Sequence, residues 1–233
     1  MDMKRKKIIV FTGAGVSAES GLKTFRDSGG LWENYKIEEV ATPQAWEKNS
    51  ALVLDFYNQR RKQCMNALPN DAHKALVRLE EKYDVQIITQ NIDDLHERAG
   101  SKKIIHLHGE ITKARSTFNE SLIYPIIGTE LNLGQFCENG YQLRPHIVWF
   151  GEAVPMMDEA IKVISYTDIL IIIGTSLNVY PAAGLVDYAP ISSSKYYIDP
   201  HATHISHIKN LSIINKTACD GVVKLVDTLL KEC

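Results

Sequence analysis

The feature that most constrains the fold lies near the N-terminus, where a short apolar run leads into a glycine turn. Residues 8–11 are Ile-Ile-Val-Phe, and after Thr12 the chain reads Gly13-Ala14-Gly15-Val16-Ser17-Ala18. An apolar run that ends at a glycine turn is typical of a buried parallel strand. The G-x-G-x-x-G/A pattern also lets a backbone approach a phosphate at a helix N-terminus. Taken alone, the pattern is weak, because a tight structural turn would explain it about as well.

Farther along the chain, apolar runs typical of strands alternate with segments typical of helices. Strands are expected at 85–89, 104–107, 147–150, 169–173 and 196–198. Helices are expected after the glycine turn and at 51–68, 71–82, 156–165, 181–188 and from about 220, with Asp71 as an N-cap. Residues 22–43 are expected to form a loop, and the alternation is lost between 109 and 144. This order predicts an α/β fold: a Rossmann-like doubly wound parallel sheet with a smaller inserted module.

Composition and charge exclude several classes of protein. The formal net charge of −2 provides no global field toward nucleic acid or an anionic membrane. The longest apolar run, 169–173, is too short to cross a bilayer, and 8–11 is too short for a signal peptide. Four scattered cysteines without a C-x-x-C pair fit free thiols in a reducing compartment. We therefore expect a cytoplasmic protein with no nucleic-acid or membrane partner.

The glycine turn continues in a way that an ordinary dehydrogenase does not. No second strand ending in Asp or Glu follows about 20 residues on; the chain instead continues through Glu19-Ser20-Gly21 to Thr24-Phe25-Arg26-Asp27. Four further segments follow in order: Thr89-Gln90-Asn91-Ile92-Asp93-Asp94-Leu95-His96, His108-Gly109-Glu110, Val148-Trp149-Phe150-Gly151-Glu152, and Gly174-Thr175-Ser176-Leu177 with Val179 and Pro181. Together these motifs resemble the sirtuin family, whose members use NAD to remove acyl groups from lysine side chains.

The resemblance implies an NAD site at the carboxyl ends of the strands, where ligands of such sheets bind. Backbone amides of Ala14 and Gly15 would meet the pyrophosphate, and the loop around Phe25 would close over the nicotinamide ribose. Asp199 stands where the family usually carries Asn. This difference keeps a hydrogen-bond acceptor at the position but removes a hydrogen-bond donor. The cofactor-binding residues implied in this way are Gly13, Ala14, Gly15, Ser17, Ser20, Phe25, Arg26, Trp32, Gln90, Asn91, Ile92, Asp93, Gly174, Thr175, Ser176, Asp199 and Ala218. Without the resemblance, Gln90 to Asp93 would be read as a polar turn with a helix cap at Asp93.

The resemblance also implies the catalytic residues, His108 and Asn91. A histidine can be neutral near pH 7 and accept a proton from a ribose hydroxyl. In the implied mechanism the acyl oxygen attacks C1′ as nicotinamide leaves, and His108 activates a ribose hydroxyl that attacks the resulting imidate. The products are free lysine, nicotinamide and O-acyl-ADP-ribose. His96 and His106 are expected to be structural.

Two groups of residues are expected to bind the acylated protein. An edge strand at Val148, Phe150 and Gly151, flanked by Val179, would hold an extended peptide by β-augmentation. Tyr57 and Arg60 lie three residues apart, hence on one face of the helix expected at 51–68. They match a pair found in bacterial sirtuins that accept acidic acyl groups such as succinyl or malonyl. A guanidinium and a phenol suit a carboxylate, although such a pair is commonly only a boundary patch.

The expected small insert lacks the zinc site of most sirtuins. Between 109 and 144 the chain has one cysteine, Cys137, and no histidine, so the two C-x-x-C pairs that would bind zinc are absent. We therefore expect no metal, and a small apolar core in its place. The side chains expected to form that core are Phe118, Leu122, Ile123, Tyr124, Ile126, Ile127, Leu131, Leu133, Phe136 and Tyr141.

We expect two domains in a monomeric enzyme. An NAD-binding domain would comprise 1–28, 69–108 and 143–233, and a small domain 29–68 and 109–142. The expected activity is NAD-dependent removal of acetyl, succinyl or malonyl groups from protein lysines. Two alternatives remain open: a mono-ADP-ribosyltransferase, in which a protein nucleophile captures C1′, and a non-catalytic NAD-binding module.

Overall fold

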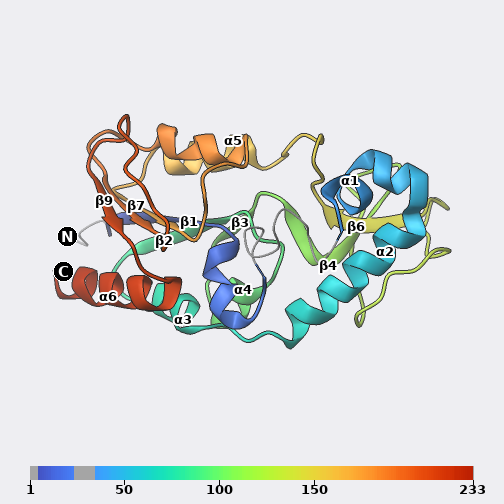
Figure 1. Ribbon diagram of the computed structural model, residues 1–233, viewed down its shortest axis with the longest axis horizontal. Coiled ribbons are helices and arrows are strands. Elements are labelled where there is room, and N and C mark those ends of the chain that lie inside the picture. The colour runs from blue at the N-terminus through green and yellow to red at the C-terminus, as the bar shows by residue number, and fades with distance from the viewer. Residues whose placement is uncertain (1–4, 24–34, 233) are drawn as a thin grey trace.

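The computed structural model describes residues 5–23 and 35–232 and contains two separate sheets (Figure 1). The larger sheet is parallel throughout, with the strand order β3-β2-β1-β7-β8-β9. Its strands are β1 (Lys7–Thr12), β2 (Asp84–Thr89), β3 (Ile104–His106), β7 (Ile169–Ile173), β8 (Ser194–Ile198) and β9 (Leu211–Ile214). The strand order reverses direction between β1 and β7, which creates the crevice where doubly wound sheets bind ligands.

Helices cover both faces of the parallel sheet because its central strands are apolar on both sides. Ile8 and Val10 of β1 pack against α3 (Asp71–Leu79) and α6 (Ala218–Lys231). Ile9 and Phe11 pack against α5 (Met157–Ile164) and the 3-10 helix η3 (Ala182–Tyr188) on the opposite face. A strand that is buried on both faces reads as a continuous apolar run, which is why β1 and β7 stand out in the sequence. Within the described residues, no helix has the length and apolar character needed to cross a bilayer.

The second sheet belongs to a smaller module, seen to the right in Figure 1. It is antiparallel, with the order β5-β4-β6, and comprises β4 (Gly109–Ser116), β5 (Ile123–Pro125) and β6 (Leu143–Ile147). The helices α1 (Ile37–Val40) and α2 (Pro43–Asn66) share a buried apolar cluster with Ile111 and Ile147 of this sheet. Because β6 pairs with β4, the antiparallel sheet continues beyond residue 142, where the sequence placed the end of the small domain.

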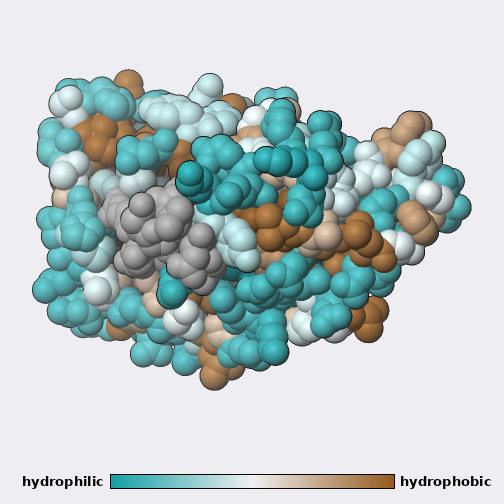
Figure 2. All heavy atoms as spheres, turned by 45° about the vertical axis from the view of Figure 1, so that its right-hand side comes forward, coloured by the Kyte–Doolittle hydropathy of each residue, from teal (hydrophilic) through white to brown (hydrophobic). Residues whose placement is uncertain are grey.

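The apolar core expected in the insert is formed only in part. Of the ten side chains expected there, Leu131 is buried, in a small cluster with Leu54 and Ala114, and the partly buried Ile126 packs against that cluster. Six of the ten are exposed: Phe118, Ile123, Ile127, Leu133, Phe136 and Tyr141. Figure 2 shows apolar surface on the half of the molecule that carries the small sheet. Arg61 of α2 organises the insert instead, because its buried guanidinium donates to the carbonyls of Ile111 (2.7 Å) and Thr129 (3.0 Å). Asn58 adds a reciprocal pair of hydrogen bonds to the backbone of Leu131.

Several element boundaries differ from those expected. The helix α2 begins at Pro43 rather than 51, because Thr42 Oγ1 caps it by accepting from the backbone of Ala45 (3.0 Å). Asn70, rather than Asp71, is the N-cap of α3, where its Oδ1 accepts two backbone N–H groups. The short helix after the glycine turn is a pair of 3-10 turns, η1 (Ala14–Val16) and η2 (Ala18–Ser20). Helix α1 lies inside the expected loop, and the short, partly buried strand β9 was not expected.

Candidate active site

A cleft of about 300 Å³ lies between the parallel sheet and the small module. Segments that follow β1, β2, β3 and β7 line one side, and residues of α2 and the segment after β6 line the other. The predicted site residues that line this cleft are Gly13, Ala14, Gly15, Ser17, Tyr57, Arg60, Gln90, Asn91, Ile92, Asp93, His108, Val148, Phe150, Gly151, Gly174, Thr175, Ser176, Val179 and Asp199. Residues from distant parts of the chain are therefore brought together as the motifs predicted.

Of the five remaining predicted site residues, the structure describes two, which do not line the cleft. Ser20 accepts a hydrogen bond from Asn70 Nδ2 (3.0 Å) beside η2, and Ala218 is buried at the start of α6. The other three, Phe25, Arg26 and Trp32, lie outside the residues that the structure describes.

The glycine turn packs directly on the turn that follows β7. A Cβ at Gly15 would lie 2.6 Å from the Cα of Gly174, so the two backbones meet where no side chain fits. The N–H of Gly15 donates to the carbonyl of Gly174 (2.8 Å) and is not available to a phosphate, contrary to the sequence expectation. Gly13 likewise donates to Ile173 (3.0 Å). The N–H of Ala14 has no partner among the described residues, so it is the amide of this turn that can meet an anion.

Polar side chains after β2 form a hydrogen-bonded chain with the glycine-turn segment. Asn91 Nδ2 donates to Ser17 Oγ (3.1 Å), and Ser17 Oγ donates to Asp93 Oδ2 (3.1 Å). The other carboxylate oxygen of Asp93 accepts from the backbone of Leu95 (3.2 Å) at the start of α4 (Leu95–Ala99), although the N-cap of this helix is Asp94 rather than Asp93. Burial raises the pKa of Asp93, against the opposing effect of these two hydrogen bonds. The arrangement holds an amide and a carboxylate rigidly at one end of the cleft.

His108 follows β3 and faces the same cleft with a defined tautomer. Its Nδ1 lies 2.9 Å from the carbonyl oxygen of Gln90, which can only accept, so Nδ1 carries the proton and Nε2 holds the lone pair. Burial lowers the pKa of His108, although the bond to Gln90 opposes this. The imidazole is therefore neutral at pH 7 and basic at Nε2. Gln90 is itself fixed by its Nε2, which donates to Thr175 Oγ1 (3.1 Å).

Tyr57 and Arg60 of α2 both line the cleft, as their spacing predicted. The Tyr57 side chain is fully buried, and its hydroxyl accepts from Trp149 Nε1 (3.1 Å). Burial raises the pKa of Tyr57, so it stays a neutral phenol. The guanidinium of Arg60 donates to Gln63 Oε1 (3.3 Å) and to the carbonyl of Lys23 (3.5 Å).

The expected edge strand at 147–150 is wrong, because β6 ends at Ile147. The backbone N–H groups that follow are used within the chain: Val148 donates to the carbonyl of His108 (3.0 Å), and Phe150 donates to the carbonyl of Ala41 (3.0 Å). Val148, Phe150 and Gly151 line the cleft in an irregular segment. An added peptide strand would therefore have to bond to carbonyls or to Gly151 rather than to a regular ladder.

Sequence reasoning missed a charged network behind this segment. Glu152 accepts from Arg144 (2.7 Å), from Arg115 (3.2 Å) and from the backbone of Trp149 (2.7 Å). The guanidinium of Arg144 lies 3.2 Å from the centroid of the Trp149 ring, and that ring in turn donates to Tyr57. Trp149 and Glu152 belong to the quoted motif, but the residues predicted to bind the peptide were Val148, Phe150 and Gly151.

Comparison with known proteins identifies the family. The Sir2 family profile matches residues 13–181. An NAD-dependent protein deacylase of Helicobacter pylori strain J99 is 52% identical over 97% of this chain and 96% of its own length. Another from Bacteroides thetaiotaomicron is 48% identical, over 97% and 98%. The crystal structure of a Sir2 homologue in complex with NAD superposes with a TM-score of 0.88 at 38% identity, covering 98% of this chain and 91% of that one. The α/β fold is thereby confirmed, and the chain belongs to the Sir2, or sirtuin, family.

Proposed function

We propose that this chain is an NAD-dependent protein deacylase that releases nicotinamide and forms O-acyl-ADP-ribose from acylated lysines. Relatives that carry the name NAD-dependent protein deacylase, at 52% and 48% identity over nearly the whole chain, support the activity. One observation carries the proposal: His108 is a neutral base whose Nε2 is the nitrogen left for proton transfer, and it lines the same cleft as the glycine turn. The site thus pairs a cofactor-sized cleft with a base that works at neutral pH.

The described residues fit NAD at this site. The N–H of Ala14 is available to the pyrophosphate. The close contact between Gly15 and Gly174 means that bare backbone, without side chains, lines the cleft at this point. Asn91 and Asp93 would orient ribose hydroxyls and the carboxamide, because both side chains are fixed through Ser17. NAD bound there would supply an anomeric carbon that becomes electrophilic as nicotinamide departs.

His108 would accept the proton of a ribose hydroxyl at Nε2. The resulting imidazolium keeps its Nδ1–H bond to the carbonyl of Gln90, which stabilises the positive charge and holds the ring in place. Asn91 would act beside it by fixing the position of the sugar. These roles make His108 the catalytic base and Asn91 the catalytic amide of the proposed reaction.

The acyl group would occupy the part of the cleft beside α2. Arg60 and the neutral phenol of Tyr57 suit a carboxylate at the end of a short acyl chain, so succinyl-lysine and malonyl-lysine are proposed substrates beside acetyl-lysine. The peptide would lie extended between Phe150 and Val179, which line the cleft.

We further propose that the small module functions without zinc. The stretch from 109 to 144 holds one cysteine, Cys137, too few for a tetrahedral thiolate site. Its buried Sγ donates a weak hydrogen bond to Ser116 Oγ (3.5 Å) at the end of β4. Together with Arg61, which ties α2 to Ile111 and Thr129, this contact replaces a metal with hydrogen bonds.

The proposal is tested by incubating the protein with NAD and matched acetyl-lysine and succinyl-lysine peptides. Mass spectrometry of the products should show free lysine peptide, nicotinamide and O-acyl-ADP-ribose in equal amounts. A modified protein without O-acyl-ADP-ribose would instead identify a mono-ADP-ribosyltransferase. Absence of nicotinamide release, with NAD still bound, would identify a non-catalytic NAD-binding module.

A further inference from the structure

Two histidines on either side of Leu107 hold two successive carbonyl groups of the segment after β2. His108 Nδ1 donates to the carbonyl of Gln90 (2.9 Å), and His106 Nδ1 lies 3.2 Å from the carbonyl oxygen of Asn91. The second bond fixes the backbone of the residue that the proposed mechanism uses to orient NAD. His106 lies at the end of β3 and does not line the cleft, so it acts on the site only through Asn91.

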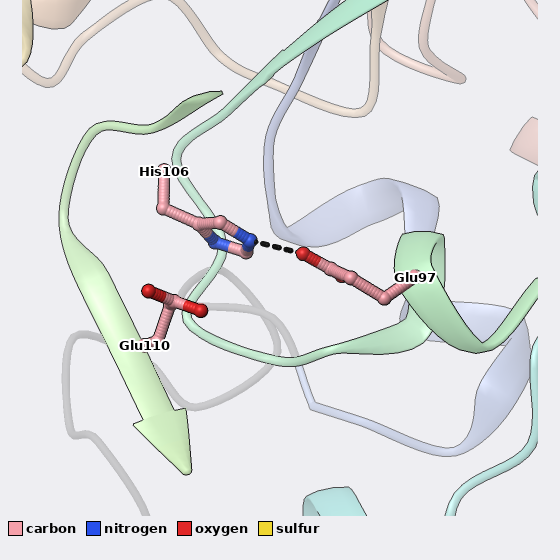
Figure 3. Close-up of side chains that lie close together, drawn as sticks. All are labelled: Glu97, His106 and Glu110. Carbon is pink, nitrogen blue, oxygen red and sulfur yellow. Dashed lines mark hydrogen bonds and ion pairs between the residues drawn. The ribbon is translucent and has the colours of Figure 1, made fainter. Parts of the chain in front are cut away.

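His106 lies close to two carboxylates from two other elements and is bonded to one of them (Figure 3). Its Nε2 lies 2.6 Å from Glu97 Oε1 on α4, and the Glu110 carboxylate at the start of β4 lies beside the same ring. Glu110 is itself bonded to Lys113 (2.7 Å). The His106 side chain is 10% exposed, whereas that of Glu97 is 40% exposed, so the ring is buried and its carboxylate partner lies at the surface. A carbonyl on one nitrogen and a carboxylate on the other both require a donor, so the ring carries two protons.

The surroundings of His106 agree with a charged imidazolium. Burial lowers its pKa, but the bond to Glu97, the charges of Glu97 and Glu110 and the bond to the Asn91 carbonyl raise it above the ordinary value overall. The other ionisable groups that interact with this ring are Asp93 and His96, on the segment that leads into α4 and on α4 itself. The charged form therefore persists to higher pH than in an ordinary imidazole, and it is lost as the pH rises through the raised pKa.

We propose that His106, charged and held by Glu97, is a positioning residue for NAD: it fixes the Asn91 carbonyl and thereby the Asn91 amide in the cleft. The inference rests on the proposed role of Asn91. When His106 loses one proton, the carboxylate of Glu97 keeps the remaining proton on Nε2, because a charged acceptor binds it more strongly than a carbonyl does. Nδ1 then faces the Asn91 carbonyl with a lone pair. The bond to Asn91 is lost, and NAD is bound less well at alkaline pH.

The test measures kcat, KM for NAD and, by calorimetry, Kd for NAD from pH 6 to 9.5. In the parent enzyme KM and Kd should rise at alkaline pH by about 2–10-fold, less than the loss of a whole charge-assisted hydrogen bond because His106 acts only through Asn91, with kcat changed less. Glu97→Gln should abolish this rise, because the neutral ring is then free to keep its proton on Nδ1. His106→Ala should have the raised KM at every pH. His106→Asn should rescue it, because the Asn amide can donate from nearly the position of Nδ1.

A matched control is the exposed pair His207 and Asp187, whose atoms lie 2.9 Å apart away from the cleft. Asp187→Asn should leave the pH profile unchanged. The proposal is overturned if Glu97→Gln keeps the alkaline rise, or if His106→Asn behaves like His106→Ala. It is also overturned if a chelator reproduces the His106→Ala behaviour, since Glu97, His106 and Glu110 would then hold a metal ion rather than a proton. If the parent forms no O-acyl-ADP-ribose, the proposed function fails, while the Kd profile still decides the role of His106.

Discussion

His108 donates its Nδ1–H to the carbonyl of Gln90 over 2.9 Å, and this bond decides which nitrogen of the ring can act as a base. Because the acceptor is a backbone carbonyl, it cannot be titrated away, and Nε2 stays unprotonated down to the lowered pKa of the buried ring. Gln90 is in turn tied to Thr175 after β7. The His108 ring is therefore positioned by the segments that follow β3, β2 and β7 of the parallel sheet.

Replacing His108 with Ala should abolish deacylation while leaving NAD binding largely intact. Loss of one general base typically costs about 10²–10⁴-fold in rate, whereas the NAD contacts proposed for Ala14, Asn91 and Asp93 remain. The measurement is kcat on an acetyl-lysine peptide together with Kd for NAD by calorimetry.

The pH profile of the parent enzyme provides the control for this variant. Since burial lowers the pKa of His108, kcat/KM should stay level through neutral pH and fall only below about 6.5, the ordinary imidazole value. Near-normal turnover in His108→Ala, or an acid limb that survives in the variant, would show that another group is the base.

The sequence predicted the fold well where burial on both faces leaves a continuous apolar run. Strand β7 was predicted at the residues it occupies, because five consecutive apolar residues end at Gly174. The cleft residues were also brought together as predicted, since parallel strands end at one edge of the sheet. The strand expected at 147–150 was wrong because it depended on contacts that the local sequence does not show. The backbone N–H groups of Val148 and Phe150 bond to His108 and Ala41, which are far away in the sequence.

The remaining errors come from interactions that no local pattern records. The sequence predicted that the amide of Gly15 would be available to a phosphate, but in the fold it donates to the carbonyl of Gly174. The apolar residues of the insert predicted a core, but the module is organised by the buried Arg61, whose partners are mainly backbone carbonyls. His106 was interpreted as structural from the sequence, because the spacing of the motifs does not show its partners. These partners are the Asn91 carbonyl and Glu97.

Glu152→Gln should destabilise the protein and disturb the acyl end of the cleft. Its carboxylate neutralises Arg115 and Arg144, whose side chains are 4% and 9% exposed, and removing one member of a buried ion pair typically costs about 3–5 kcal/mol. Burial raises the pKa of Glu152, but the bonds from Arg144 and Trp149 and nearby charges lower it overall. Its contribution to stability is therefore present above the unfolded pKa and is lost as the pH falls through the lower folded pKa.

Urea denaturation at pH 7, and again in steps toward pH 4, measures this contribution. Glu159→Gln on the exposed face of α5 is the matched control and should change the free energy of unfolding by less than about 0.5 kcal/mol. A Glu152 variant as stable as this control would mean that Arg115 and Arg144 are solvated without their partner.

The purified protein should contain far less than one zinc ion per chain. Cys137 is the single cysteine of the insert, and the hydrogen bonds of Arg61 and Asn58 connect the module without a metal. Elemental analysis gives the zinc content, and thermal unfolding with and without a chelator should give the same Tm. Stoichiometric zinc, or a Tm lowered by the chelator, would contradict the proposal that hydrogen bonds rather than a metal ion stabilise the insert.

Arg60→Met should discriminate between acyl groups. If the guanidinium pairs with a terminal carboxylate, the change should weaken succinyl-lysine turnover by about 10–100-fold, the effect of one charge-assisted hydrogen bond of roughly 1.5–3 kcal/mol. Acetyl-lysine has no such carboxylate, so its kcat/KM should stay within a few-fold of the parent. The measurement is kcat/KM on matched succinyl and acetyl peptides. Equal losses on the two would mean that Arg60 shapes the cleft in general and recognises no acidic acyl group.

Tyr57→Phe should behave differently from Arg60→Met, because the Tyr57 hydroxyl has a second role inside the protein. It accepts the N–H of Trp149, and its removal leaves that buried donor without its partner, at a cost of about 1–3 kcal/mol. We therefore expect the variant to lose activity on both peptides, with an additional loss on succinyl-lysine from the missing phenol donor. Unfolding measurements should show the destabilisation directly. A variant with unchanged stability and a loss confined to succinyl-lysine would mean that the hydroxyl serves the substrate alone and that its contact with Trp149 is incidental.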